Sequence, residues 1–208
     1  MNKKPILMNR VMQQHRSSRG DVIGIVGAHS GAGATYTAFL LAFALGEELG
    51  RKTAYLECNH SCDLNRIQNS YLWSRDEGYA FSFSNITFYK GVPVSRITEV
   101  LNEKYQSYIL DFGSGLEQNI DEFLRCNIKI ILGDQSEWNW QKFIQFNDSI
   151  QGIPGNESWI PIIPCISRKE LGRRRRELKR AIYTIPFEPD PTEPSKHTIR
   201  LLYQLLNK

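Results

Sequence analysis

The residues of this chain that are best suited to bind a charged ligand lie in one glycine-rich stretch, Gly27 to Thr35. The stretch follows the apolar run Val22–Val26 and precedes a helical pattern from Thr37 to Leu49. The first turn of a helix has unpaired N–H groups and a positive dipole end, which together favour an anion such as phosphate. The sequence therefore predicts an anion-binding loop between a strand and a helix.

The loop has the frame of a Walker A phosphate-binding motif, GxxxxGK[ST], without its lysine. Gly33-Ala34-Thr35 stands where Gly-Lys-[Ser/Thr] is expected, so Ala34 occupies the position of the lysine that contacts the β- and γ-phosphates. The first expected glycine is Ala28. The residues predicted to contact a nucleotide are His29, Ser30, Gly31, Ala32, Gly33, Ala34, Thr35 and Tyr36.

Two other interpretations of the loop are weaker. A dinucleotide-binding loop needs G-x-G-x-x-G and an acid about 20 residues further on. Glu57 is passably placed for that acid, but Gly31-Ala32-Gly33 is followed by Tyr36 where the third glycine is needed. In the second interpretation the glycines serve only the geometry of a tight strand-to-helix turn.

Strands and helices alternate along the chain, and most strands are almost continuously apolar. This pattern predicts an α/β fold with a three-layer, doubly wound, mostly parallel sheet. The expected strands span 22–26, 53–56, 80–89 (a strand or hairpin), 107–112, 127–132, 159–166 and 182–185. The expected helices span 37–49, 63–73, 94–105, 117–124, 137–150, 168–181 and 195–206. Residues 1–20 are expected to be a flexible basic arm, and residues 21–208 a single domain.

The composition is typical of a soluble globular protein and excludes several classes. The chain has 208 residues, of which 41% are hydrophobic and 23% are charged, and its net charge is +4. No stretch approaches the roughly 20 apolar residues of a membrane span, and no secretory signal is recognisable at the N-terminus. The four cysteines show no disulfide framework, which favours free thiols in the cytoplasm. The spacing C-x-H-x-C at Cys58–Cys62 provides too few ligands for a zinc site.

An arginine run near the C-terminus is the strongest charge feature. The basic patch predicted there consists of Arg168, Lys169, Arg173, Arg174, Arg175, Arg176, Lys179 and Arg180. The simplest explanation of this patch is a surface helix exposed to solvent. The alternatives are contact of the patch with an anionic membrane, with DNA or with an acidic partner. The helix has no broad apolar face for membrane insertion. Trp138 and Trp140 precede it on another predicted helix, where core and protein-interface roles are expected.

The order of these features resembles the MinD/ParA family of deviant Walker A ATPases, over roughly residues 21–206. The family loop reads KGGxGK[ST]T, and His29 to Tyr36 has the same frame. The family also has a pair of aspartates at the end of a strand, and Leu56–Asn59 occupies the corresponding place in this chain. Tyr105–Gly115 is similar to the family pattern Y-D-x-I-I-x-D-x-x-x-G, and Ile185–Pro191 is similar to its IP-x-D turn.

The resemblance implies a phosphate-loop NTPase fold with ATP and Mg²⁺ as ligands, if nucleotide binds. Thr35 and Asp111 would then hold the metal ion. Four positions depart from the family. The signature lysine, which crosses the dimer interface, is His29; the phosphate-loop lysine is Ala34; and the aspartate pair is Glu57 and Asn59. Glu57 and Asp111 are vestigial catalytic candidates, and Glu57 is equally suited to hydrogen-bond the neighbouring loops.

Losing both lysines should remove most of the hydrolysis, because phosphoryl transfer depends on positioning and charge stabilisation. We therefore expect a non-hydrolysing scaffold or localisation factor that acts through a homodimer or a protein partner. The TadZ-like branch of Flp/Tad pilus localisation factors is the most similar branch. The alternatives are a slow or partner-activated ATPase, and a DNA- or anionic-membrane-binding partition-like module that uses Arg173–Arg176. The expected location is the cytoplasm, or the inner face of the membrane as a peripheral protein.

Overall fold

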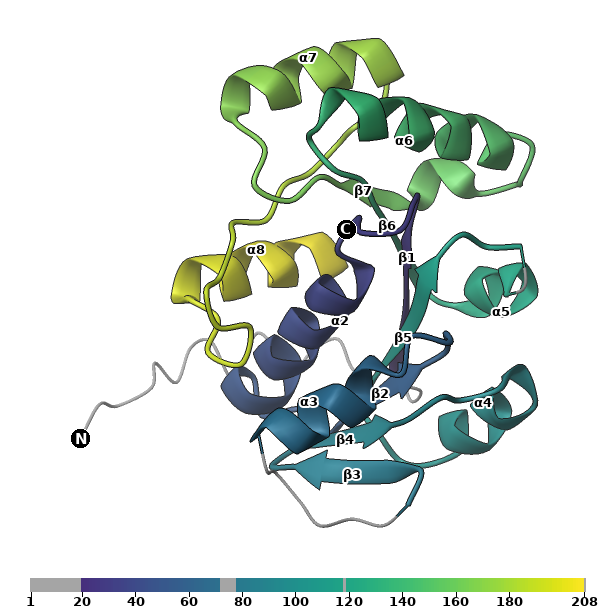
Figure 1. Ribbon diagram of the computed structural model, residues 1–208, viewed down its shortest axis with the longest axis vertical. Coiled ribbons are helices and arrows are strands. Elements are labelled where there is room, and N and C mark those ends of the chain that lie inside the picture. The colour runs from purple at the N-terminus through teal and green to yellow at the C-terminus, as the bar shows by residue number, and fades with distance from the viewer. Residues whose placement is uncertain (1–19, 72–77, 118, 208) are drawn as a thin grey trace.

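The computed structural model describes residues 20–71, 78–117 and 119–207 (Figure 1). Its strands form one seven-stranded sheet in the order β3-β4-β2-β5-β1-β6-β7, and only the β3–β4 pair is antiparallel. The predicted three-layer α/β fold with a mostly parallel sheet is confirmed. The strands are β1 (Asp21–Gly27), β2 (Thr53–Glu57), β3 (Ala80–Phe83), β4 (Ile86–Tyr89), β5 (Ser107–Ser114), β6 (Ile128–Leu132) and β7 (Ile160–Ile162).

Two groups of helices cover the two faces of the sheet (Figure 1). The first face packs against α2 (Ala34–Phe43), its π-helical continuation η1 (Ala44–Glu48), α3 (Asp63–Tyr71) and α8 (Lys196–Leu206). The second face packs against α4 (Val94–Leu101), α5 (Ile120–Arg125), α6 (Glu137–Ile150) and α7 (Arg168–Leu178). A short 3-10 turn, η2 (Asn156–Ser158), precedes β7.

The register of the central strands brings the candidate residues to one edge. β1 lies between β5 and β6, and its last residue, Gly27, pairs with Ser114 and Leu132. On the other side of β5, Glu57 pairs with Asp111. Because these strands are parallel, their carboxyl ends and the loop after β1 lie together at the same edge, which is where ligands bind in open α/β sheets.

The local sequence explains several element boundaries. The predicted strand 159–166 is shorter in the structure, because Pro164 has no N–H for the ladder and β7 ends at Ile162. Residues 182–185 are not a strand: only Tyr183 forms a bridge, to Ile162. In η1, a Cβ on Gly46 would lie 2.3 Å from Cγ1 of Ile86, so the glycine allows this turn to pack closely on β4.

The other predicted boundaries differ by a few residues. α2 begins three residues before Thr37, α4 ends before Tyr105, and α5 begins at Ile120, three residues later than predicted. The hairpin expected at 80–89 is present as β3 and β4. The predicted arm at residues 1–19 and the end of the predicted helix at residues 72–73 lie outside the described residues. None of the helices in the described ranges is both long and apolar enough to cross a bilayer.

Candidate functional site

The glycine-rich loop has the backbone of an anion-binding loop. Gly31 and Gly33 have φ values of 83° and 90°, and a Cβ on either would meet nothing within 4 Å. Glycine is therefore required at these two positions by the backbone conformation and not by packing. No hydrogen bond among the described residues engages the N–H groups of Gly33, Ala34 or Thr35 at the start of α2. These donors remain available for an anion, as the sequence predicts.

No cationic side chain among the described residues accompanies these donors. Ala34 is buried in the first turn of α2 at the position of the missing lysine. Within the described part of the chain, no lysine or arginine makes a hydrogen bond or ion pair with residues 27–35. The loop can therefore orient a phosphate through backbone dipoles, but no fixed positive side chain neutralises its charge.

His29 is turned back onto its own loop. Its side chain is only 8% exposed, and Nδ1 lies 2.9 Å from the carbonyl oxygen of Ser30. Nε2 is buried without a hydrogen-bond partner among the described residues. Nearby, burial raises the pKa of Asp134, but hydrogen bonds from Ser136 and Asn139 outweigh the burial, so the pKa of Asp134 is lowered; the imidazole of His29 contributes least to this lowering. The position that the resemblance assigns to a dimer-crossing lysine is therefore occupied by an inward-facing side chain.

Asp111 is completely buried, and both of its carboxylate oxygens accept hydrogen bonds. The hydroxyl group of Tyr55 donates to Oδ2 at 2.8 Å, and the N–H group of Gly113 donates to Oδ1 at 2.9 Å. The hydroxyl group of Thr35 lies close enough to this carboxylate to help lower its pKa. Burial raises the pKa of Asp111, and these three donors oppose that shift. The structure thus brings Thr35 and Asp111 together, and Tyr55 is a third member that the sequence did not predict.

Glu57 is engaged by the loops around it. Its side chain is 2% exposed. Oε1 accepts from the N–H group of Leu64 at 3.1 Å and from the hydroxyl group of Ser61 at 3.4 Å, and Oε2 accepts from the N–H group of Gly91 at 3.0 Å. These bonds join the start of α3 and the turn after β4 to the end of β2. The observed geometry is that of a loop anchor, one of the two roles expected for Glu57.

Asn59 lies at the edge of a small cavity. Its Nδ2 donates to the backbone oxygen of Asp111 at 3.1 Å, and its Oδ1 accepts from the N–H group of Ser61 at 2.9 Å. The cavity has a volume of about 350 Å³ and lies between residues 59–61 and 112–115, with Glu117 and Asn119 on its wall. A Cβ on Gly113 would lie 3.0 Å from that of Asn59, so the two strand-end loops are in close contact.

Tyr36 connects α2, the helix that follows the glycine-rich loop, to the distant segment around Glu188. Its hydroxyl group donates to the backbone oxygen of Glu188 at 2.8 Å and accepts from the Glu188 N–H group at 2.9 Å. The ring of Phe187 stacks on Tyr36, with centroids 6.1 Å apart. The carboxylate of Glu188 accepts from the hydroxyl groups of Ser195, at 2.6 Å, and Thr198, which begin α8. Phe187, Glu188 and their contacts were not among the predicted site residues; the IP-x-D-like turn was the only signal for them.

The predicted basic patch is divided by the structure. Arg174 is 1% exposed, and its guanidinium carbon lies 4.4 Å from the centroid of the Trp140 ring. Glu137 and Glu177 flank it at 3.1 and 3.4 Å. Arg173 pairs with Glu137 and, at 2.8 Å, with Glu170. Arg174 is therefore not a surface residue, and it is removed from the predicted contact patch.

Two further arginines of the patch bind the backbone of their own chain. Nε and Nη2 of Arg175 donate to the oxygen of Ile182 at 2.8 and 2.6 Å. Arg180 donates to the oxygen of Trp159 at 2.8 Å and to Oδ1 of Asn147 at 3.1 Å. These contacts fix the ends of α7 and α6 against η2 and the segment after α7. Within the described residues, the patch members without a hydrogen bond or ion pair are Arg168, Lys169, Arg176 and Lys179.

The sheet order and the loop after β1 define a phosphate-loop α/β fold. No family model and no curated protein matches the chain. Among solved structures, it is similar to a ParA family ATPase from Chlorobium tepidum TLS, with 16% identity and a TM-score of 0.64; the match covers 92% of this chain and 99% of the other. It is also similar to MinD in the MinC:MinD cell division protein complex of Aquifex aeolicus, with 15% identity and a TM-score of 0.67, over 91% and 97% of the two chains.

A third similar structure is the septum site-determining protein MinD complexed with Mg-ADP from Pyrococcus horikoshii OT3. The identity is 15% and the TM-score 0.62, and the match covers 90% of this chain and 94% of the other. The protein therefore has the fold of the MinD and ParA ATPases over nearly its whole length. At these identities the similarity concerns the fold, so the site must be judged from its own residues.

The residues of this chain fit a phosphate better than they fit Mg-ATP. The free N–H groups of the loop suit phosphate oxygens. Both oxygens of Asp111 are already hydrogen-bonded, Glu57 is engaged by backbone and hydroxyl donors, and no lysine or arginine contacts the loop among the described residues. Among the described residues, a metal-nucleotide complex at this loop would lack a side-chain cation. The donor set therefore does not fit a complete Mg-ATP site.

Proposed function

We propose that this protein is a MinD/ParA-fold domain with a degenerate nucleotide site, which acts as a non-hydrolysing scaffold or localisation factor through protein contacts. The observation that carries the proposal is the loop at residues 27–35, which keeps its anion-binding backbone while no side-chain cation among the described residues contacts it. Cationic contacts on a transferring phosphoryl group contribute orders of magnitude in rate. Without them, the fold retains its surfaces and loses its chemistry.

The carboxylates support the same conclusion. Glu57, at the position where the resembling family has a catalytic aspartate, anchors loops through three hydrogen bonds. Both oxygens of Asp111 accept hydrogen bonds, from the hydroxyl group of Tyr55 and the N–H group of Gly113. Both carboxylates are thus engaged in holding the strand-end structure. Defects at four positions around one site are better explained by a lost activity than by one tolerated substitution.

A slow or partner-activated ATPase is the second candidate, because the Thr35–Asp111 contact and the free N–H groups at the start of α2 are retained. A cation would then have to come from a partner. We favour the scaffold, acting in the cytoplasm or at the inner face of the membrane in a Flp/Tad-like assembly. DNA or anionic lipid is a less suitable partner for the basic patch, since half of its residues are engaged within the chain.

Steady-state ATP hydrolysis by the full chain separates the two candidates. We expect no turnover above that of Asp111→Ala, with Mg²⁺ present and at any protein concentration. Hydrolysis that is brisk in the wild type and abolished in Asp111→Ala would overturn the scaffold proposal. Turnover that appears only when a second protein is added would favour the partner-activated ATPase.

A further inference from the structure

The charge of this chain is divided unevenly between α7 and the rest. Residues 168–180 contain eight lysines and arginines against two glutamates, while the whole chain contains 26 basic and 22 acidic residues. All other residues together therefore hold 18 basic against 20 acidic residues, and five of those 18 basic residues lie within the first 19 positions. A basic helix is thus attached to a body of opposite net charge, so the helix of one copy would be attracted to the acidic body of another.

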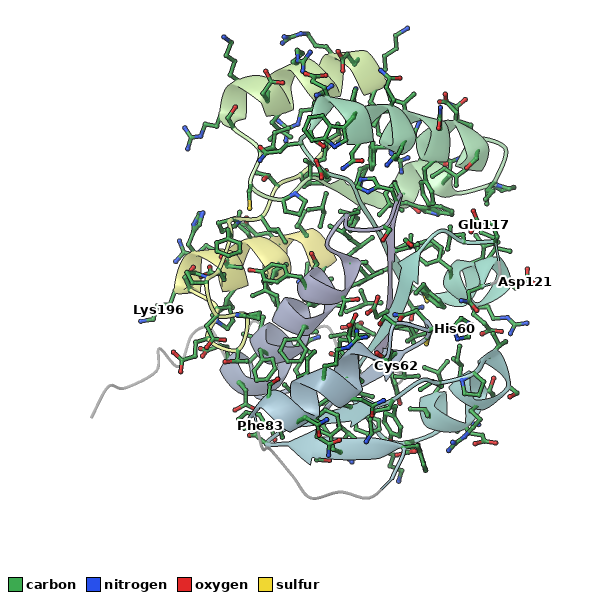
Figure 2. All side chains as sticks on the ribbon, in the orientation of Figure 1. His60, Cys62, Phe83, Glu117, Asp121 and Lys196 are labelled. Carbon is green, nitrogen blue, oxygen red and sulfur yellow. The ribbon has the colours of Figure 1, made fainter. Side chains whose placement is uncertain are left out.

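The unpaired cations lie on one face of α7. Arg168 and Arg176 are two turns apart, Lys169 is beside Arg168, and Lys179 follows the last turn. All four are exposed, and among the described residues none of them makes a hydrogen bond or ion pair. Figure 2 shows nitrogen-tipped side chains that extend from α7 away from the sheet. The acidic residues of α7 are not available to neutralise them, because Glu170 and Glu177 pair with Arg173 and Arg174.

Gly172 lies in the middle of this face, between Arg168 and Arg176. A glycine in a helix interior costs about 1 kcal/mol relative to alanine. A Cβ there would have Arg176 Nη1 as its nearest neighbour at 3.8 Å, an ordinary contact, so the packing of this chain does not require glycine. The missing side chain allows another surface to approach the helix backbone between the two arginines.

An acidic surface of matching chemistry lies beside α5. Glu117 and Asp121 are both exposed and have no hydrogen bond or ion pair among the described residues. Figure 2 shows both at the outer edge of the molecule. Glu117 also lies on the wall of the 350 Å³ cavity, next to Asn119, so the end of a basic side chain could enter beside an unpaired carboxylate.

We propose that the outer face of α7, with Arg168, Lys169, Gly172 and Arg176, docks on the Glu117–Asp121 surface of a second copy of this chain. The two surfaces belong to different parts of the molecule (Figure 1), so the contact is heterologous. In a pair of copies, the α7 face of one copy and the Glu117–Asp121 surface of the other therefore remain free. Further copies then add to form a ring or a linear assembly. The contact is mainly electrostatic and is weakened by salt.

The test measures association of the full chain by sedimentation at about 50 mM and about 500 mM NaCl, conditions that differ several-fold in screening. We expect the average mass of wild type to rise at least twofold above 24.0 kDa at low salt and to return to it at high salt. Arg168→Glu with Arg176→Glu removes the basic surface, and Glu117→Lys with Asp121→Lys removes the acidic one. Each double variant should remain monomeric alone.

Mixing the two double variants provides the decisive result. Each retains the surface that the other lacks, and the two reversed surfaces are also complementary in charge, so the mixture should associate. The matched control is Lys196→Glu with Arg200→Glu on α8, where both residues are exposed and Lys196 points outward in Figure 2. It makes the same change in net charge and should associate like wild type.

Three outcomes would overturn the inference: a wild type that is monomeric at low salt, a mixture that stays monomeric, or a control that behaves like the α7 variant. Salt-sensitive binding of the monomer to duplex DNA, or to vesicles with anionic phospholipid, through α7 would instead assign the surface to those partners. The inference extends the proposed scaffold role. Because its test measures association without nucleotide, it can fail while the hydrolysis test succeeds, and the reverse is also true.

Discussion

At the scale of single residues, Asp111 and Glu57 show how a strand-end carboxylate can be retained for structure. Glu57 accepts hydrogen bonds from the adjoining loops and Asp111 from β2 and β5, and the two residues lie opposite each other across the β2–β5 pair. A buried carboxylate is tolerated when several donors satisfy it. Here those donors are backbone N–H groups and hydroxyl groups of the same chain. The pair therefore holds the carboxyl edge of the sheet in shape without any reaction.

Glu57→Gln should lower the free energy of unfolding by about 1–3 kcal/mol. The amide has one acceptor oxygen, so a buried N–H group of Leu64 or Gly91 loses its partner. Urea denaturation checks this value. Glu117→Gln is the matched control, because that side chain is exposed, and its effect should stay within about 0.5 kcal/mol. Equal stability of Glu57→Gln and wild type would contradict the anchoring role.

The sequence indicated Thr35, Asp111 and the loop as candidates because their spacing follows a known motif, and their role as a site stays a prediction. It did not identify Tyr55 as the donor to Asp111, because a tyrosine in an apolar strand is ordinarily a core residue. The contact depends on the register that places β2 beside β5, and this register has no local signal. Arg174 was misplaced for a related reason. Its burial depends on Trp140 of another helix, and the arginine run gives no indication of which member faces inward.

At the scale of elements, α7 is joined to α6 by a buried cation. Arg174 lies over Trp140 and between Glu137 and Glu177, and Arg173 adds a second contact to Glu137. The pKa of Glu137 is lowered by the hydrogen bond from Arg173 and by the ion pair with Arg174. This joint fixes the orientation of α7 and so determines which arginines remain on its outer face.

Arg174→Ala should therefore destabilise the protein by about 2 kcal/mol, through loss of the cation–π contact and of buried side-chain packing. Arg176→Ala, which removes an exposed and unpaired arginine from the same helix, should change stability by less than about 0.5 kcal/mol. Thermal unfolding followed by circular dichroism measures both. Similar losses in the two variants would show that the joint does not depend on Arg174.

A second joint connects α2 to α8 through Glu188, and it predicts a pH dependence. Hydrogen bonds from Ser195 and Thr198 lower the pKa of Glu188. The unfolded chain therefore takes up this proton more readily than the folded chain. The stabilisation is complete above the ordinary glutamate pKa of about 4.3 and is lost as pH falls through the lowered value.

Glu188→Gln cannot titrate, yet its amide oxygen can still accept from either hydroxyl group. Between about pH 5 and pH 3, the Tm of wild type should fall more steeply than that of Glu188→Gln. Parallel pH profiles of Tm would show that Glu188 does not contribute to acid unfolding. The difference between the two profiles isolates Glu188, because wild type and Glu188→Gln share all other titrating groups.

At the scale of the whole molecule, the alternation of apolar strands and amphipathic helices was sufficient to predict the α/β class. The near-continuous apolar strands β1 and β2 are buried on both faces, as that class requires. The antiparallel edge strand depends on the hairpin turn at residues 84–85, and the end of β7 depends on Pro164. A pattern of apolar residues predicts that a strand is present but does not give the residue at which it ends. The seven-strand order follows from crossovers between distant segments, and these leave no local pattern in the sequence.

The central claim is that the fold has kept its phosphate loop and lost the cation that makes the loop bind nucleotide tightly. Calorimetric titration of ATP with Mg²⁺ into wild type and Ala34→Lys tests this most directly. A lysine at the start of α2 would add a charge-assisted contact to phosphate, so Ala34→Lys should bind at least about tenfold more tightly than wild type. A wild type that binds at micromolar concentration or better, with no gain in Ala34→Lys, would contradict the account.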